Sequence, residues 1–546
     1  MSGIVQQLWR MSGGVHPEFH KAISTHSPIE TSAIPKELIV PLQQHVGHLP
    51  DLQVSVGDTV YKGQVLATSS HAGVSAAVHA PSSGTVSKID NHALPHPSAL
   101  PGLCVTIKTD GKDDWGSERM APLANYTEQS PEDLLARIDA AGVVGLGGAV
   151  FPSEVKLASA GQGRVDTLII NGAECEPYIS CDDMLMRERA AEVLQGIDIV
   201  MYLLKAKRCL IGIEDNKPEA VGALKAALEQ NTQLANAANI EVIAVPTMYP
   251  SGDARQLTKI LTGLEIPRNV RSPTLGSLCH NVGTVYSIYC AVVLGEPLLS
   301  RIVTVTGDGI QQPKNFDALL GTPFSFLVEQ AGGYTKRAER LIMGGPMMGF
   351  ALPSDEFPVV KATNCILVSS KAELRLNQQP EPPTERLVMP CIRCGKCMQA
   401  CPVELLPQQL YWHARAKDFE KAAEHKLADC IECGACSYVC PSHIPLVDYF
   451  RFAKTEIKAQ ELATLKANQS RERHEFNEYR KVRDKAEREA KRQKQKEALQ
   501  QKKAGAAGGG DNKQDVIKAA MERAKAKKAA LKAQAETQQD DSDHAV

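Results

Sequence analysis

Two groups of four cysteines constrain this chain more than any other feature of its 546 residues. In each group two residues separate the first three cysteines, and a fourth cysteine follows after three more residues and precedes a proline. The groups are Cys391, Cys394, Cys397 and Cys401, and then Cys430, Cys433, Cys436 and Cys440. At this spacing three thiolates bind three corners of one metal–sulfur cube, and the fourth reaches the neighbouring cube. The spacing therefore predicts two sites with crossed ligands.

This cysteine run is typical of bacterial ferredoxins, which hold two [4Fe–4S] clusters. We assign cluster one to Cys391, Cys394, Cys397 and Cys440, and cluster two to Cys430, Cys433, Cys436 and Cys401. A disulfide framework fits poorly with a reducing cytoplasm. Zinc sites favour paired knuckles of two cysteines and leave the other cysteines at these offsets unexplained. The seven cysteines before residue 366 are interpreted as core residues.

The composition limits the class of protein. Hydrophobic residues make up 43% and charged residues 23%, which is ordinary for a soluble globular protein of several domains. Aromatic residues are only 5%, which argues against a nucleic-acid-binding role based on base stacking. No signal peptide is visible, and no run approaches the roughly 18 apolar residues of a membrane span. We expect a chain that stays in the cytoplasm or lies on a membrane surface.

The first part of the chain predicts an all-β domain. Residues 36–110 alternate short Val and Ile runs with turns. The segments Val56–Leu66 and Ala80–Val86 resemble the two halves of a biotinyl/lipoyl-type barrel. Such carriers are modified on a lysine in the hairpin between the halves, and here that hairpin has no lysine. We interpret this domain as structural.

The middle of the chain predicts an α/β domain, because strand and helix patterns alternate from about residue 130 to 295. The predicted strands are Val165–Ile170, Arg208–Ile213 and Glu241–Val245, and the predicted helices are Pro218–Gln230 and Asp253–Thr262. Strand–helix alternation favours a mainly parallel sheet with crossover helices. Ligands of such folds bind beyond the carboxyl ends of the strands.

Beyond residue 300 the pattern changes again. Residues 301–350 predict a small module of short strands and glycine turns, and residues 351–385 predict a linker rich in Pro and Gln. After Lys454 the chain becomes rich in Ala, Lys, Glu, Arg and Gln, with more basic than acidic residues, and predicts a long polar helix followed by disorder. Its basic charge suggests an anionic lipid or an acidic partner protein as a docking surface.

A glycine-rich segment, residues 142–156, is the most informative stretch outside the cysteines. Four glycines in seven positions allow backbone N–H groups to approach and cradle a phosphate, and Lys156 adds a positive charge. Taken alone, the segment is also compatible with a structural turn. Polar loops at residues 171–176, 249–254 and 280–284 follow predicted strands or strand–helix junctions, so a convergent pocket is expected. Because two iron–sulfur clusters need an electron source, a flavin is the expected converter between two-electron and one-electron transfer.

The order of these motifs resembles the C subunit of the Rnf complex, also called Rsx, over residues 5–450. The segments Gly13–Pro17 and Gly344–Gly349 are also similar to that family. The α/β part resembles the flavin- and NADH-binding subunit of respiratory complex I. The resemblance implies a multidomain α/β protein: an N-terminal barrel-sandwich domain (1–125), a Rossmann-like FMN- and NADH-binding domain (126–298), an SLBB-like β-grasp module (299–352), a linker (353–385), a helical 2[4Fe–4S] ferredoxin domain (386–450) and a basic tail, helical and partly disordered (451–546).

The resemblance also implies roles for individual residues. Gly145, Gly147, Gly148 and Lys156 would hold the phosphate and ring edge of FMN, and Asn171, Asp253 and Asn281 would contact its ribityl and phosphate side. Phe151 would stack on the adenine of NADH, and Glu174 and Glu176 would face the nicotinamide nucleotide. Four residues depart from the complex I pattern: Leu146 replaces an Arg, Ala173 an Asp, His280 an Asn and Gly283 a Glu.

The implied function is electron entry into an ion-translocating oxidoreductase. Electrons from NADH would pass through non-covalent FMN to the two clusters and on to integral-membrane subunits or ferredoxin-type carriers. The chain would be peripheral, on the cytoplasmic side of the cell inner membrane. Two alternatives stay open at this point: a soluble flavin and iron–sulfur oxidoreductase with its own small substrate, and an iron–sulfur electron-transfer adaptor without flavin.

Overall fold

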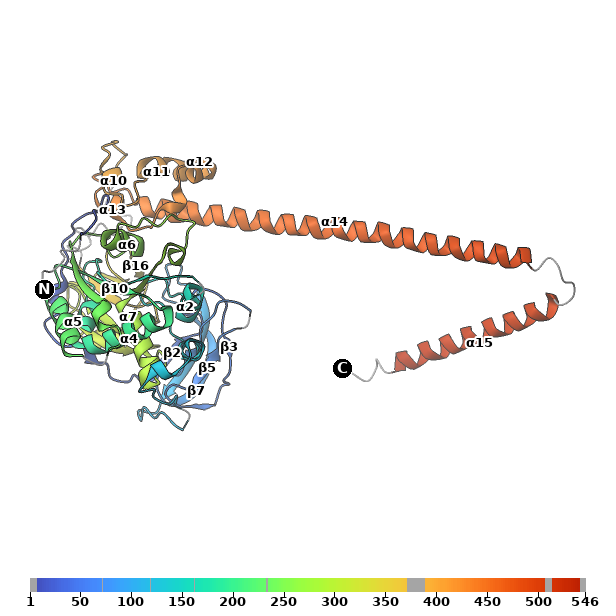
Figure 1. The fold of residues 1–546 in the computed structure, drawn as a ribbon, viewed down its shortest axis with the longest axis horizontal. Helices are drawn as coiled ribbons and strands as arrows, with labels where there is room; N and C mark the ends of the chain where they lie inside the picture. The colour runs from blue at the N-terminus through green and yellow to red at the C-terminus, as the bar shows by residue number, and fades with distance from the viewer. Residues whose placement is uncertain are drawn as a thin grey trace. The chain divides into compact units, whose positions relative to one another are not determined.

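The computed structural model describes residues 7–70, 72–117, 119–161, 163–231, 234–370, 388–505 and 513–540. The chain divides into two compact units, Met1–Ile457 and Lys458–Val546, and the ribbon in Figure 1 follows both. The first unit contains both cysteine groups and three layers: an all-β layer, an α/β layer and a layer built on a mixed sheet. The second unit is helical throughout its described residues.

The first layer of the larger unit is a pair of small antiparallel sheets. One sheet has the order β2 (Glu37–Pro41), β8 (Pro101–Thr109), β7 (Gly84–Ala93) and β4 (Thr59–Val60). The other has the order β3 (Asp51–Leu52), β5 (Val65–Thr68) and β6 (Val78–His79). Alternate side chains of both sheets point inward, and Leu38, Leu66 and Ile107 are fully buried between them. The all-β domain predicted for residues 36–110 is confirmed.

The α/β layer is a four-stranded parallel sheet with the order β11 (Ile240–Val245), β10 (Arg208–Glu214), β9 (Thr167–Gly172) and β12 (Ser277–Asn281). The chain adds β10 and β11 on one side of β9 and then returns to place β12 on the other side. The order therefore reverses between β9 and β12, and ligands of open α/β sheets bind at such a switch point. Its helices are α1 (Pro131–Ala140), α2 (Ser153–Gly161), α3 (Cys181–Glu188), α4 (Ala190–Leu204), α5 (Pro218–Gln230), α6 (Ala254–Thr262) and α7 (Val282–Tyr289).

The third layer is a six-stranded mixed sheet that corrects one prediction. Its order is β1 (Glu30–Thr31), β14 (Lys314–Leu319), β13 (Ser300–Thr306), β17 (Cys365–Ser369), β15 (Arg340–Met343) and β16 (Phe350–Leu352), with helix α8 (Phe324–Gln330) beside it. Strand β17 falls in the stretch that the sequence assigns to a linker, 353–385, yet it lies inside this sheet and is buried along its whole length. The linker prediction is therefore wrong for 365–369, and residues 371–385 lie outside the described residues.

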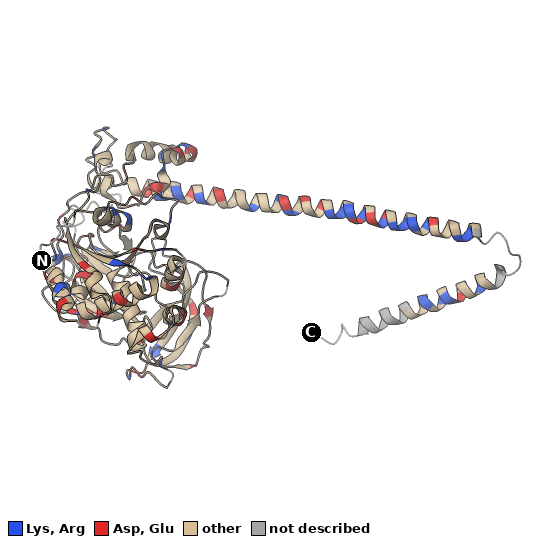
Figure 2. Ribbon diagram, viewed as in Figure 1, with Lys and Arg blue, Asp and Glu red and all other residues tan. Residues whose placement is uncertain are grey.

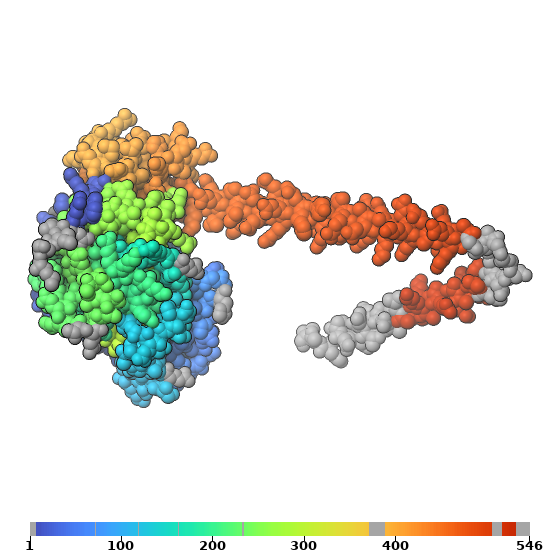
Figure 3. Space-filling model, in the orientation of Figure 1, coloured from blue at the N-terminus to red at the C-terminus, as the bar shows by residue number. Residues whose placement is uncertain are grey.

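The cysteine-rich segment is mostly short helices: α10 (Lys396–Gln399), α11 (Pro407–Ala416), α12 (Phe419–Glu424) and α13 (Ala435–Tyr438). In Figure 3 this light-orange segment lies against the dark-blue N-terminal segment and the green α/β layer.

The tail is formed by α14 (Leu446–Gly505) and α15 (Lys513–Asp540). Blue and red positions are interspersed along α14 in Figure 2, as the predicted polar helix requires. Helix α15 occupies the stretch for which composition predicted disorder, because its Ala, Lys and Glu residues favour helix. Within the described part of the chain, every helix is too short or too polar to cross a bilayer.

Candidate functional site

The glycine-rich segment forms a closed loop with an exposed tip. The N–H of Gly145 donates to the carbonyl of Phe151 (2.8 Å), and the N–H of Ser153 donates to the carbonyl of Val143 (3.0 Å). Between these bonds, Gly147 and Gly148 are exposed. Gly148 has a φ of 109°, which side chains rarely adopt, and a Cβ there would meet no atom within 4 Å. The tip therefore offers open backbone to a ligand.

This loop lies over the start of α7 and is bonded to the other two layers at its base. The N–H of Leu146 donates to the Thr284 hydroxyl (2.9 Å), and a Cβ on Gly147 would lie 3.1 Å from the Cβ of Asn281. At the base of the loop, the buried Lys361 ammonium donates to the carbonyls of Gly142 (2.7 Å) and of Ala77 in the first layer. Burial lowers the pKa of Lys361 to about 7. The position of the loop thus depends on residues from all three layers.

Two asparagines stand side by side at the switch point of the sheet. Asn171 and Asn281 are register partners at the carboxyl ends of β9 and β12. The Asn281 carbonyl oxygen caps α7 by accepting from the N–H of Gly283 (2.9 Å), and its amide donates to Asp182 (2.6 Å). The Asn171 amide donates to the carbonyl of Gly252 (2.8 Å). The structure therefore brings the glycine loop and both asparagines together.

The remaining polar candidates line the same edge of the sheet. The Lys156 ammonium donates to the carbonyl of Cys279 on β12 (2.5 Å), and burial lowers its pKa. Burial, aided by the charge of Lys156, lowers the pKa of His280 well below its usual value, so this imidazole is neutral. Its buried Nε2 has no hydrogen-bond partner among the described residues. Asp253 caps α6 by accepting from the N–H groups of Arg255 and Gln256 (both 3.1 Å).

The two predicted acidic residues are engaged with the backbone. The Glu174 carboxylate accepts from the N–H groups of Asp182 (2.7 Å) and Asp183 (3.3 Å) at the start of α3. The Glu176 carboxylate accepts from the N–H groups of Met347 (2.6 Å) and Met348 (3.0 Å) in the third layer. Burial raises the pKa of Glu176 to about 7. Their contact with a nicotinamide nucleotide stays a prediction, as does that of the half-buried Phe151.

Lys21, which no sequence pattern singled out, holds the acidic loop of residues 174–179 in place. Its buried ammonium donates to the carbonyls of Glu174 (2.8 Å), Glu176 (2.9 Å) and Ile179 (2.5 Å), and burial lowers its pKa. Nothing in its sequence neighbourhood distinguishes Lys21 from a surface lysine, because its partners are carbonyls about 150 residues further along the chain.

The residues at the switch point fit a flavin mononucleotide. Exposed glycine N–H groups and the start of α7 suit an anionic phosphate, since a helix begins with free N–H groups and a positive dipole end. The amides of Asn171 and Asn281 and the carboxylate of Asp253 suit hydroxyl groups. The group would be held by Gly145, Gly147, Gly148, Lys156, Asn171, Asp253 and Asn281.

The eight cysteines line two separate cavities. One is lined by Cys391, Cys394, Cys397 and Cys440, and the other by Cys401, Cys430, Cys433 and Cys436. Each set therefore draws three thiols from one sequence group and the fourth from the other, as crossed ligation by two [4Fe–4S] clusters requires. All eight thiols are free of disulfides. The grouping of the thiols around the two cavities is the one predicted for clusters one and two.

The cavity of cluster two lies against the α/β layer. The Tyr249 hydroxyl, at the start of the loop after β11, donates to the carbonyl of Cys433 (2.5 Å). Tyr249, Cys175 and Val15 pack with Cys433 and Ala435 in one buried apolar group. The Cys175 thiol accepts from the N–H of Gly252 (3.2 Å), whose carbonyl accepts from Asn171. A continuous run of contacts thus joins the switch point to cluster two.

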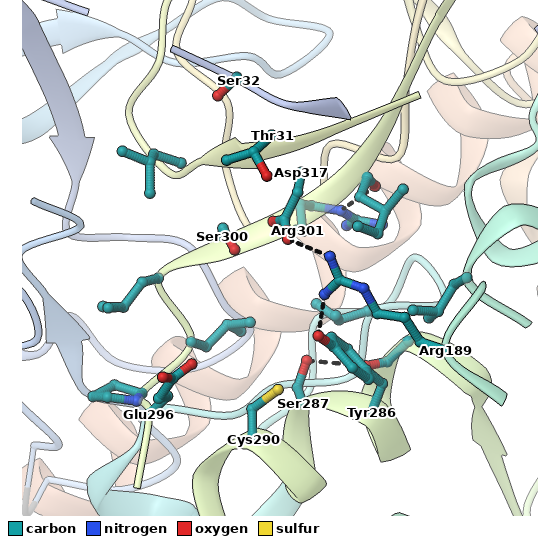
Figure 4. A pocket seen from close by; sticks show the side chains of 18 of the residues that line it. Thr31, Ser32, Arg189, Tyr286, Ser287, Cys290, Glu296, Ser300, Arg301 and Asp317 are labelled. Atoms are coloured by element: carbon teal, nitrogen blue, oxygen red, sulfur yellow. Dashed lines mark hydrogen bonds and ion pairs between the residues drawn. The ribbon is translucent and has the colours of Figure 1, made fainter. Parts of the chain in front are cut away.

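A larger cavity of about 480 Å³ lies between α3, α7 and the third layer. In Figure 4, Arg189 stands between the carboxylate of Asp317 and the hydroxyl of Tyr286, and Arg301 lies nearby. The cavity reaches the switch point at Leu146 of the glycine loop, at Gly283 and at Asp182, and burial together with the neighbouring Glu174 raises the pKa of Asp182. Lys62 and Asp113 at its wall also form an ion pair (2.6 Å), so most of its charges are balanced within the protein.

Four family profiles match separate parts of the chain. Residues 138–290 match the Nuo51 FMN-binding domain and residues 390–444 the 4Fe-4S dicluster domain. Residues 9–112 match the RnfC barrel sandwich hybrid domain, and residues 302–351 match the SLBB domain. The predicted FMN-binding domain, ferredoxin domain, barrel-sandwich domain and SLBB-like module are therefore confirmed as domain types.

Curated relatives match across nearly the whole chain. The C subunit of the ion-translocating oxidoreductase complex of Serratia proteamaculans is 46% identical over 523 residues, which cover 96% of this chain and 70% of that protein. Its counterpart in Yersinia pestis is 47% identical over 483 residues, covering 88% and 75%. That of Erwinia tasmaniensis is 48% identical over 500 residues, covering 92% and 60%, so this chain spans about two thirds of the length of such relatives.

Among solved structures, an NAD+-reducing [NiFe]-hydrogenase in the H2-reduced state covers 60% of this chain and 62% of its own, with 17% identity and a TM-score of 0.44. That likeness is too weak to carry an argument. The four domain matches and the relatives agree with the two thiol cavities and the glycine loop: this chain belongs to the RnfC family, the C subunits of ion-translocating oxidoreductase complexes.

Proposed function

We propose that this chain is the electron-entry subunit of an ion-translocating oxidoreductase complex. In this role it takes electrons from NADH and passes them through FMN and two [4Fe–4S] clusters to other subunits. The observation that carries the proposal is the run of contacts from Asn171 through Gly252 and Cys175 to Tyr249 and Cys433. It supports cluster two as the first acceptor, because its cavity adjoins the switch point.

The residues at the switch point bind and orient rather than perform acid–base chemistry. Bound FMN supplies the exchange between hydride transfer from NADH and single-electron transfer to the clusters. The glycine loop and the start of α7 would hold its phosphate, and the two asparagines would hold its hydroxyl groups. Burial lowers the pKa of both His280 and Lys156, and the Lys156 ammonium donates to the carbonyl of Cys279, so both side chains keep this edge polar. Positioning of this kind accounts for a large share of the rate of a transfer reaction.

The partners and location follow from the same role. Electrons leaving the chain need an acceptor in the complex, either an integral-membrane subunit or a ferredoxin-type carrier. The chain would bind at the cytoplasmic side of the cell inner membrane as a peripheral subunit. Helix α14, with its many exposed lysines and arginines, supports a docking role toward anionic lipid or an acidic subunit. Loss of membrane association on deleting residues 455–546 would support that role, and unchanged association would contradict it.

The test is an anaerobic absorption spectrum of the purified full chain before and after NADH, with flavin and iron quantified. The proposal expects about one flavin and about eight iron atoms per chain, and bleaching of the cluster absorbance by NADH. Iron without flavin, and clusters that NADH does not reduce, would favour an adaptor that only carries electrons. Full activity with a small soluble substrate, without any membrane subunit, would favour an independent oxidoreductase.

A further inference from the structure

The two cysteine groups are one local structure used twice. In each, the residue before the second cysteine has a left-handed backbone, with φ of 56° at Arg393 and 57° at Glu432. The glycine after that cysteine is also left-handed, with φ of 76° at Gly395 and 80° at Gly434. A four-residue helix follows in both, α10 and α13. Every residue around cluster one therefore has a counterpart around cluster two.

In the second copy, one face of this structure is covered by the rest of the protein. Cys433 and Ala435 are 7% and 0% exposed and pack with Tyr249 and Val15. Ile431 packs against the same group. A Cβ on Gly434 would lie 2.7 Å from the carbonyl oxygen of Met347. This is the face through which the chain connects cluster two to the switch point.

In the first copy, none of the described residues covers the same face. Ile392, the counterpart of Ile431, is 68% exposed, and Cys394, the counterpart of Cys433, is exposed although it is a cluster ligand. A Cβ on Gly395 would meet no atom within 4 Å. Met389 and Met398, in the same segment, are 52% and 42% exposed. Clustered apolar side chains of this kind are a mark of interaction sites.

The charge of the uncovered face differs from that of its covered counterpart. Arg393 stands where the second copy has Glu432, and Lys396 stands where it has Ala435. Both cations are exposed, and residues 388–399 contain no Asp or Glu. A bound cluster would place its own negative charge beneath them, but a partner would meet the exposed guanidinium and ammonium groups first. An acidic surface complements this face.

We propose that residues 388–399, here called the outer cluster face, dock an acidic protein or domain that carries a one-electron iron–sulfur centre. The inference rests on the proposed function and names the partner that receives its electrons. One electron passes from reduced cluster one to the oxidised centre of the partner, with no bond formed or broken and no proton transferred. Exposed Cys394 marks where the cluster comes nearest to the partner.

The test uses the full holo-chain, reduced under anaerobic conditions, and a purified acidic 2[4Fe–4S] ferredoxin as the acceptor. Stopped-flow absorbance gives the second-order rate of electron transfer at low and at high salt. Reversing both charges (Arg393→Glu with Lys396→Glu) is expected to lower the rate about tenfold at low salt and little at high salt, because salt screens the steering. Ile392→Ser is expected to lower the rate at both salt concentrations, because it removes apolar contact area.

The matched control is Lys421→Glu, which reverses a charge on exposed helix α12 of the same domain and is expected to leave the rate unchanged. Equal rates in the double charge reversal, the control and the unchanged chain would overturn the proposal. So would self-association of the chain that Ile392→Ser abolishes, because a second copy would then be the occupant.

Failure of the docking face and failure of the proposed function give different results. In each variant, NADH-driven bleaching of the chain's own clusters is measured without acceptor, and the docking face predicts no change there. If NADH bleaches no cluster even in the unchanged chain, the proposed function fails. Dithionite still reduces the clusters in that case. The difference in transfer rate between the charge-reversed and the unchanged chain at low salt then tests the outer cluster face by itself.

Discussion

The repeat within the cluster domain allows the contact between the second cysteine group and the third layer to be tested by a matched pair of substitutions. Gly395→Ala and Gly434→Ala place the same methyl group at equivalent positions, and both glycines are left-handed, with φ of 76° and 80°. A side chain in that conformation costs roughly 1–2 kcal/mol. Both variants share this cost, so the difference between their losses of unfolding free energy measures the effect of the atoms that surround each glycine.

Those surroundings differ in one respect. At Gly395 the added Cβ meets no atom within 4 Å, whereas at Gly434 it lies 2.7 Å from the carbonyl oxygen of Met347. That backbone must move, and overpacking of this kind typically costs about 1–3 kcal/mol more. We expect Gly395→Ala to destabilise the cluster domain by about 1–2 kcal/mol and Gly434→Ala by about 2–5 kcal/mol.

The assay is anaerobic urea unfolding of the holo-chain, followed by the cluster absorbance, together with hydrogen exchange at the N–H groups of Met347 and Met348. These N–H groups donate to Glu176, so displacement of the Met347 backbone should expose them in Gly434→Ala and not in Gly395→Ala. Equal destabilisation by the two variants, with unchanged exchange at Met347, would refute the close approach of cluster two to the third layer.

Three further predictions concern the clusters, the glycine loop and a buried lysine. Cys401→Ser should impair the cluster held by the second cysteine group, although Cys401 belongs to the first, and electron paramagnetic resonance of the reduced chain will identify the altered cluster. Gly147→Ala should weaken FMN binding several-fold in a fluorescence titration, because its Cβ would lie 3.1 Å from Asn281. The free energy of unfolding should rise with pH from about 7 to 10.5 by up to about 1.4 kcal/mol per unit through Lys361.

The sign of the pH effect follows from the direction of the shift. Folding lowers the pKa of Lys361 to about 7 from 10.5, so between these values the unfolded chain binds more protons and stability increases with pH. Below pH 7 the folded chain carries the full cost of the buried charge. Lys361→Met should remove this slope, and a stability difference between variant and unchanged chain that is constant from pH 7 to 10 would contradict the assignment.

The other two predictions have their own controls. Cys440→Ser should impair the other cluster, and loss of the same cluster in both cysteine variants would contradict crossed ligation. Gly222→Ala, on helix α5, adds a methyl group in open space and should leave FMN affinity unchanged. If Gly147→Ala also leaves it unchanged, the glycine loop does not contact the cofactor.

Local patterns predicted the elements that depend on local interactions. Helix α5 has the predicted bounds, Pro218–Gln230, and α6 begins one residue after the predicted Asp253, which is its capping residue. Three of the four strands of the parallel sheet, β9, β10 and β11, were also predicted to within two residues, because strands buried on both faces are nearly continuous apolar runs. The fourth strand, β12, was not predicted. Strand β17 was missed, because nearby prolines and glutamines outweighed a five-residue apolar run that only its place inside a sheet explains.

The sequence by itself determined the iron–sulfur chemistry and the all-β and α/β character of the first two layers, because thiol spacing and strand–helix alternation are properties of neighbouring residues. The order of the motifs along the chain, through its resemblance to a family, added the flavin and the SLBB-like module. Only the tertiary structure decided which cluster cavity adjoins the switch point, that Lys21 and Lys361 hold the loops of the site, and that Cys394 is exposed whereas its counterpart Cys433 is buried. These features depend on contacts between segments more than a hundred residues apart. Such contacts form when the layers bury their apolar faces against one another. Local sequence patterns do not predict which layer will cover which face.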